Sequence, residues 1–125
     1  MNTKPWEELS RMYSSLDPFN EGLARVRSGH ECFHIHPDGA PTYEQRYEDV
    51  GSFSEGLARV RERPDIFKES HWFHIRFNGI AAYAERHYEV DDFCNGLAGV
   101  WERGQPGDYA SEIAFYIYPN RIRVE

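Results

Sequence analysis

Hydrophobic and polar residues alternate along three short segments that share the pattern F-x-I-x-P/F-D/N, at residues 33–38, 73–78 and 115–120. In the first segment Phe33 and Ile35 fall on one side of an extended chain, and His34 and His36 fall on the other. The first two segments also run into turn sequences, Pro-Asp-Gly and Asn-Gly. The alternation and the turns together predict a β-strand in each segment, with the phenylalanine and isoleucine side facing the core.

A second pattern, Y/H-x-x-V/L-x-x-F-x-x-G-L-A-x-V, precedes each of these segments, at residues 13–26, 47–60 and 87–100. Its second half, G-L-A-R-V-R in the first two copies, is too short for a helix and begins after a glycine. We expect it to form a strand that pairs with the following F-x-I segment in a hairpin. Glycines 22, 56 and 96 are then expected at positive φ or in a bulge where each strand begins.

The two patterns together make an internal repeat. When the chain is shifted by 40 positions, residues 32–63 match 72–103 without a gap, and 14 of 32 positions are identical. The sequence therefore predicts a single domain, 1–125, that is all-β and is built of about three antiparallel β-meanders. The expected repeat blocks are 11–42, 43–82 and 83–125.

Two stretches, 43–50 and 83–90, are ambiguous between strand and helix. Tyr43, Arg46 and Tyr47 also fit helical spacing. A bent third strand of the meander is the preferred interpretation, because Thr42 would cap a helix poorly and Gly51 would end it poorly. Residues 5–16 are expected to form a short N-terminal helix instead, because their apolar residues follow one helical stripe.

The chain begins and ends inside a repeat. We therefore expect the two termini to complete one unit together, as in a closed circular repeat fold. The end strands would otherwise be open to self-association with another chain.

These residues resemble the WG-repeat family, in which a W-G-Y-I-D-x-x-G strand alternates with F-S-E-G-L-A-x-V. The likeness covers about residues 11–120, and "FSEGLARV" at 53–60 matches its second half closely. The first half departs from the family, because Trp72-Phe73 stands in place of Trp-Gly and Cys32-Phe33 lacks the tryptophan. The resemblance implies an all-β repeat module used for binding or as a scaffold, and it implies no fixed enzyme activity.

Composition narrows the classes of partner. The net charge is −7 and no basic run exceeds two residues, so neither a nucleic acid nor a membrane surface is an expected partner. The two cysteines do not form a disulfide framework. No apolar stretch has the length of a signal peptide or of a membrane span. These features predict a cytoplasmic protein.

The side of each F-x-I strand that faces away from the core carries the candidate binding residues. It holds a ring at the same position in every copy, His34, His74 and Tyr116. A ring repeated in this way is typical of cross-strand packing, and it also offers the side chains that dominate many interfaces. The predicted partner-binding residues are Trp72, His74, Arg76, His34, His36, Tyr116 and Tyr118.

The segment "HECFHIH" raises a second candidate, a metal site. His34 and His36 lie on one face of a strand, and Cys32 or His30 could add a further ligand for zinc. The sequence lacks the C-x-x-C spacing of a zinc finger and the G-x-S-x-G motif of a hydrolase.

Three hypotheses of function follow. The preferred one is a non-enzymatic repeat module, without a cofactor, that binds a protein or peptide through the ring-bearing strand face and the hairpin tips at 28–31, 64–71 and 104–113. The second is a metal- or small-ligand-binding protein centred on the histidines, with zinc as its cofactor and with hydrolytic activity in one version. The third is a structural piece of a longer repeat array.

Overall fold

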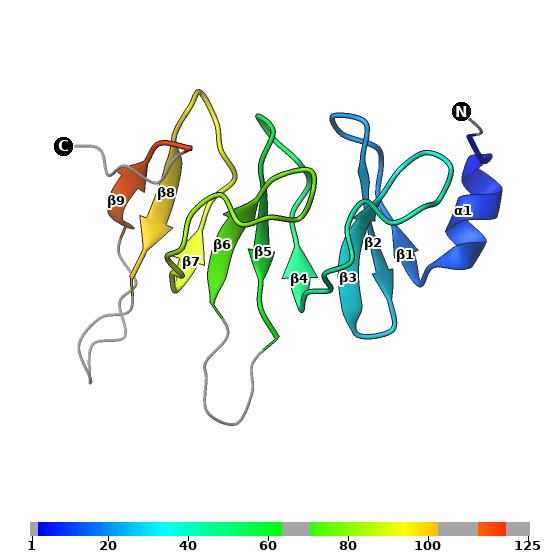
Figure 1. Cartoon of the computed structure of the whole chain (residues 1–125), viewed down its shortest axis with the longest axis horizontal. Coiled ribbons are helices and arrows are strands. Elements are labelled where there is room, and N and C mark those ends of the chain that lie inside the picture. Colours follow the sequence, from blue (N-terminus) through cyan, green and yellow to red (C-terminus); the bar gives the residue numbers. More distant parts are fainter. Residues whose placement is uncertain (1–2, 64–70, 103–112, 120–125) are drawn as a thin grey trace.

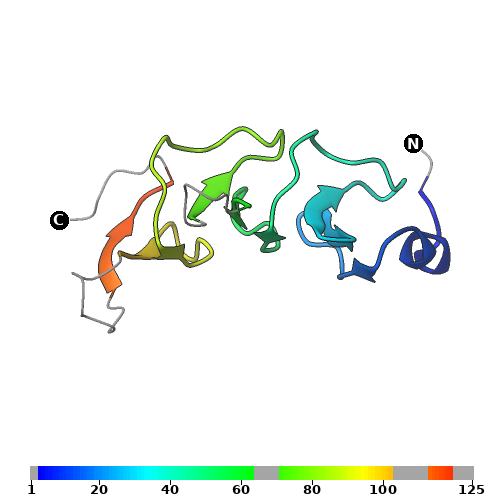
Figure 2. The ribbon, with the colours of Figure 1, turned by 90° about the horizontal axis from the view of Figure 1, so that it is seen from below.

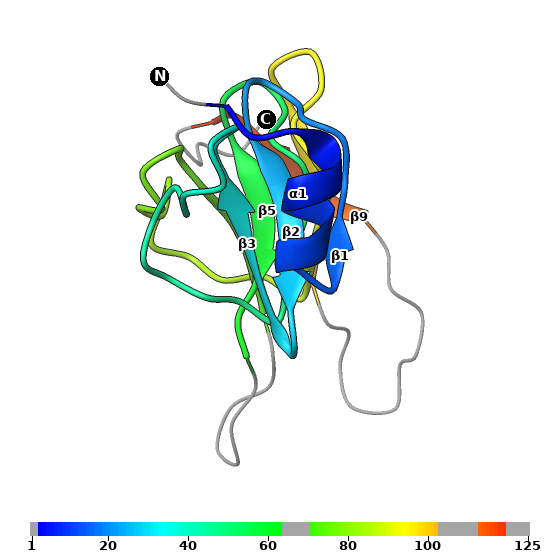
Figure 3. The same ribbon diagram turned by 90° about the vertical axis from the view of Figure 1, so that its right-hand side faces the viewer.

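Three small β-sheets follow one another in a row, with one helix at the end where the chain begins (Figure 1). This is a computed structural model, and it describes residues 3–63, 71–102 and 113–119. Seen from below, the segments that connect one sheet to the next run along one side of the row (Figure 2). Seen from the end, α1 lies in front of the first sheet and the other sheets lie behind it (Figure 3).

Each sheet is a three-stranded antiparallel meander. The chain starts with helix α1 (Trp6–Met12). The first sheet contains β1 (Ser15–Leu16), β2 (Ala24–Ser28) and β3 (Glu31–Ile35). The second contains β4 (Asp49–Val50), β5 (Ala58–Arg61) and β6 (Trp72–Ile75). The third contains β7 (Glu89–Val90), β8 (Ala98–Trp101) and β9 (Ile113–Ile117). The predicted all-β fold of tandem meanders with a short N-terminal helix is confirmed.

The expected third strand over 43–50 and 83–90 is wrong for most of its length. Only Asp49–Val50 and Glu89–Val90 are strands, and the preceding residues are bends rather than helix. The bends follow the outer edge of the previous strand, where Tyr47 exchanges two backbone hydrogen bonds with Cys32, at 2.8 and 3.0 Å. The connecting segment therefore covers an edge that would otherwise be open.

The N-terminal helix is shorter than the predicted 5–16. It ends at Met12, because the backbone N–H of Ser14 already donates to the carbonyl of Arg27 and β1 begins at Ser15. Leu9 is only 1% exposed, and the side chains of Leu9 and Met12 both pack against the turn at Gly39. Trp6, by contrast, is exposed and does not belong to the core.

The expectation that the two termini complete one repeat together is also wrong. Within the described residues, the first sheet consists of β1, β2 and β3, and the third consists of β7, β8 and β9. Helix α1 and strand β9 lie at opposite ends of the row (Figure 1). Each sheet is complete within a local stretch of chain, so the array has no need to close on itself.

The turn before each long strand explains the repeated acidic-residue–glycine pair. Glu21 and Gly22 both have positive φ, 52° and 83°, and the flanking residues bond to each other across a two-residue turn. Two consecutive positive φ values define the type I′ turn, which matches the twist of a hairpin. The same angles recur at Glu55–Gly56 and at Asn95–Gly96, so the predicted positive φ at the three glycines is confirmed.

The acidic residues of these turns also connect one repeat to the next. The Glu21 carboxylate accepts hydrogen bonds from the backbone N–H groups of Glu55 and Gly56, at 2.7 and 2.8 Å. The Glu55 carboxylate in turn accepts one from Gly96, at 2.7 Å. Charge-assisted bonds of this kind are about twice as strong as neutral ones. They form a ladder that runs from turn to turn along the array.

Helix α1 takes the place that the connecting segment takes in the next repeat. A Cβ on Gly39 would lie 3.1 Å from a methyl group of Leu9, and a Cβ on Gly79 would lie 2.6 Å from the Cβ of Tyr43. Leu9 and Tyr43 thus pack against the same turn in successive repeats. The helix is therefore a cap for the first sheet.

The closeness of Tyr43 to Gly79 predicts a severe effect of Gly79→Ala. Alanine at φ 84° costs about 1–2 kcal/mol in backbone strain, and the clash adds about 1–3 kcal/mol. Gly56→Ala is the matched control, since Gly56 has φ 81° and no atom within 4 Å of the added Cβ. Urea unfolding should show a clearly larger loss for Gly79→Ala. Equal losses would contradict the packing.

Candidate functional site

The most conspicuous polar side chain of the first repeat, His34, is completely buried at the joint between two repeats. Its exposed fraction is 0%, and its ring packs on Phe53 of the second repeat with centroids 4.5 Å apart. Nδ1 lies 2.6 Å from the hydroxyl of Tyr43, and Nε2 lies 2.8 Å from the carbonyl oxygen of Gly51. The side chain therefore joins β3 to the connecting segment and to the end of β4.

The hydrogen-bond partners fix the tautomer of this histidine. A carbonyl oxygen can only accept, so Nε2 must carry the proton that is donated to Gly51. Nδ1 is then the acceptor, and the Tyr43 hydroxyl donates to it. Both ring nitrogens are thus satisfied in the neutral form.

His74 repeats this arrangement between the second and third repeats. It is also 0% exposed, it lies 2.6 Å from the Tyr83 hydroxyl and 2.8 Å from the Asp91 carbonyl, and it packs on Phe93. The third copy has Tyr116 at this position, and its side chain is 47% exposed. The histidine is thus present at the two joints and absent from the last sheet.

Burial dominates the protonation of the two joint histidines. It lowers the pKa of His34 from 6.5 to about 4, and the bond to the Gly51 carbonyl opposes this only in part. Burial lowers the pKa of His74 to about 4 as well. Burial also raises the pKa of Tyr43 and of Tyr83, so both hydroxyls stay protonated and able to donate.

The expectation that the ring-bearing face is exposed for binding is wrong at His34 and His74. Both faces of β3 are buried, because the connecting segment and the next repeat cover the side that was expected to face outward. Trp72 is half-buried between Arg59 and Arg61, and His36 is half-buried in a turn. Arg76, Tyr116 and Tyr118 are exposed.

The structure does not bring the residues of the predicted zinc site together. Both nitrogens of His34 are already bonded, and Cys32 is buried with its thiol directed at the Glu48 carbonyl, 3.5 Å away. His30 is exposed at the opposite end of the hairpin from His36. Over residues 3–63, 71–102 and 113–119, no group of three or more His, Cys, Asp or Glu side chains is arranged to hold a metal ion.

An exposed apolar groove lies between the second and third repeats. Its volume is about 420 Å³, and it is lined by Glu55, Gly56, Leu57, Arg76, Phe77 and Pro119. Phe77 falls on the phenylalanine and isoleucine side of its F-x-I segment, which was predicted to face the core. It is nevertheless 43% exposed, and its ring centroid lies 4.8 Å from that of Phe53. The strand β6 ends at Ile75, so Phe77 lies in the turn beyond the sheet.

Of the two charged side chains beside this groove, one is hydrogen-bonded within the described chain and the other is not. The Glu55 carboxylate is held by the N–H of Gly96. The Arg76 guanidinium makes no hydrogen bond or ion pair with any part of the chain that the structure describes. Arg76 is therefore the cation that remains free to meet a ligand here, next to the apolar surface of Phe77.

Comparison with known families finds one similarity. The model of the WG-containing repeat matches residues 9–29 and 35–63, which are therefore similar to repeats of that family. The matches cover the first sheet in part and much of the second repeat. The third sheet has the same strand order, but its β8–β9 pairing has a register shift between Val100 and Trp101. Neither the curated proteins nor the solved structures include a significant match.

Among the described residues, no helix is long and apolar enough to cross a bilayer.

The lowered pKa of the two histidines predicts a loss of stability in mild acid. The unfolded chain binds protons at these sites below pH 6.5, whereas the folded chain does so only near pH 4. Stability is therefore fully present above pH 6.5 and falls as the pH drops to 4, by roughly 3 kcal/mol for each histidine.

His34→Gln should remove about half of this pH-dependent loss, because glutamine does not titrate. The free energy of unfolding, measured by urea denaturation at steps between pH 7 and pH 4, gives the comparison. An unchanged pH dependence in His34→Gln would contradict the buried neutral histidine.

Proposed function

We propose that this chain is a non-enzymatic repeat module that binds a protein or peptide partner through the groove between its second and third repeats. The observation that supports this most is Phe77, a large apolar side chain held in place on Phe53 and left 43% exposed at a concave surface. Exposed aromatic residues beside an arginine are typical of the residues that dominate protein interfaces.

The lining of the groove suggests the chemistry of the partner. Leu57, Phe77 and Pro119 offer apolar surface, and Arg76 offers a guanidinium that has no partner among the described residues. The partner that fits is an extended segment with an apolar side chain for the groove and a carboxylate for Arg76. Burial of one such side chain contributes about 1.5–3 kcal/mol, so several contacts must add to it for useful affinity.

The histidines support a role without catalysis. A general base needs a titrating nitrogen within reach of a substrate. In His34 and His74 both nitrogens are bonded inside the protein and the rings are closed to solvent. Their chemistry is used to join repeats.

A peptide-display selection on the immobilised protein tests this function directly. We expect enriched peptides that combine an apolar residue with a nearby Asp or Glu. Phe77→Ser should weaken their binding at least tenfold, and Arg76→Glu should do the same for the acidic peptides.

Ile80→Ser is the matched control. Ile80 is 54% exposed in the same turn but does not line the groove, so this variant should bind as the wild type does. A selection that enriches no peptide would contradict the proposed function, and so would peptides that bind Phe77→Ser unchanged.

A further inference from the structure

The second repeat holds an aromatic ring against two arginines. In the β5–β6 hairpin, Arg61 is directly opposite Trp72. The guanidinium carbons of Arg59 and Arg61 lie 5.1 and 5.5 Å from the centre of the indole. Both distances are within the range of cation–π attraction.

The first repeat has the same two arginines but no ring. Arg25 and Arg27 occupy the register positions of Arg59 and Arg61 in the β2–β3 hairpin. The residue opposite Arg27 is Cys32, where the second repeat has Trp72. The small thiol cannot cover the surface that an indole covers.

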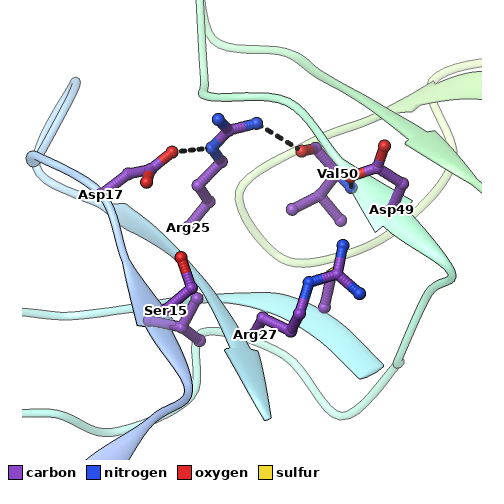
Figure 4. A pocket seen from close by; sticks show the side chains of 8 residues that line it. Ser15, Asp17, Arg25, Arg27, Asp49 and Val50 are labelled. Atoms are coloured by element: carbon purple, nitrogen blue, oxygen red, sulfur yellow. Dashed lines mark hydrogen bonds and ion pairs between the residues drawn. The ribbon is translucent and has the colours of Figure 1, made fainter. Parts of the chain in front are cut away.

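A pocket of about 290 Å³ lies at this place, at the joint of the first and second repeats (Figure 4). Its lining includes Arg25, Val26 and Val50. The corresponding hollow beside Trp72 is lined by Arg61, Trp72, Tyr88 and Glu89. The counterparts of Arg25, Val26 and Val50 in the second and third repeats are Arg59, Val60 and Val90, and they do not line it. The hollow beside Trp72 still has a volume of about 250 Å³, so the loss of the indole changes mainly the lining of the pocket: Val26 and Val50 are accessible in the first repeat.

The charged groups of the pocket are balanced and partly free. Arg25 is held by the carboxylate of Asp17 and by the Val50 carbonyl, 3.1 Å away (Figure 4). The Arg27 side chain makes no hydrogen bond or ion pair with described residues. One oxygen of Asp49 accepts from the Val50 N–H, at 2.9 Å, and its other oxygen has no bond within the described chain. A free guanidinium and a free carboxylate oxygen therefore face one pocket.

We propose that this pocket binds a small, planar, uncharged aromatic heterocycle with an N–H donor, of the size of indole, which takes the place that Trp72 fills in the next repeat. The ring lies against the Arg27 guanidinium, and the N–H donates to the Asp49 carboxylate. Two arginines and two aspartates give the lining no net charge, which favours a neutral ligand over an anion. The pocket is at the lower end of the range of about 300–1,000 Å³ for ligand sites, as suits a single fused ring system. This site is separate from the groove of the proposed function.

Indole itself is the probe, and the readout is the amide chemical shifts of the ¹⁵N-labelled full chain during a titration. We expect saturable shifts around Arg27, Cys32 and Val50, with one binding event. Benzoate, which has a ring but carries a negative charge and no N–H, should bind at least tenfold more weakly. The absence of saturable shifts with indole at this joint would overturn the proposal.

Two substitutions exchange the equivalent residues Cys32 and Trp72 between the first and second repeats. Cys32→Trp places an indole in the pocket and should abolish the shifts, whereas Trp72→Cys should produce a second set around Arg61 and Val90. Arg27→Gln, at an exposed residue that makes no bond within the described chain, should weaken binding at least threefold and keep the dispersed spectrum of the folded protein. Unchanged indole binding in Cys32→Trp or in Arg27→Gln would overturn the proposal, and so would a Trp72→Cys variant that folds and gains no second site.

Discussion

A buried, neutral histidine at each joint is the interaction on which this array depends. Each sheet has only three short strands, and a sheet of this size cannot bury both of its faces alone. His34 and His74 each make two hydrogen bonds across the joint. One ring nitrogen bonds to a tyrosine of the connecting segment, and the other bonds to a backbone carbonyl at the first strand of the next sheet. The histidine thus closes one sheet and positions the next. Its burial costs stability when the ring must be protonated, so the joints are also the acid-sensitive part of the structure.

The other regular features follow from this joint. Once the repeats are held at a fixed spacing, the Glu21 carboxylate reaches the N–H groups of the next turn, and Glu55 does the same one repeat further on. The connecting segment covers the outer edge of the preceding strand, and α1 stands in for that segment where the array begins. The Phe77 groove and the Arg27 pocket are two surfaces that remain open, and both lie where the residues of one repeat differ from those of its neighbours.

Periodicity predicted the architecture because each repeat copies the same pattern of core residues. A strand in each G-L-A-x-V and F-x-I segment, the turns with positive φ and the number of meanders could be read from it, whereas the strand ends could not: the F-x-I strand predicted from residue 33 to 38 is Glu31–Ile35. The joint was missed, because a pattern of alternation assumes that one strand face is solvated. A signal was present: a tyrosine follows both His34 and His74 after nine residues, at Tyr43 and Tyr83, and Glu125 stands at that distance from Tyr116. The exposure of Phe77 could not be predicted, since it depends on the strand ending at Ile75.

A double-mutant cycle on His34 and Tyr43 tests the central claim most directly. The free energy of unfolding is measured for the wild type, His34→Gln, Tyr43→Phe and the double variant at pH 7.5. The account predicts a coupling energy of about 1 kcal/mol or more, because the Tyr43 hydroxyl donates to the His34 ring inside the protein. Losses that simply add, within about 0.3 kcal/mol, would show that the two side chains do not form the joint.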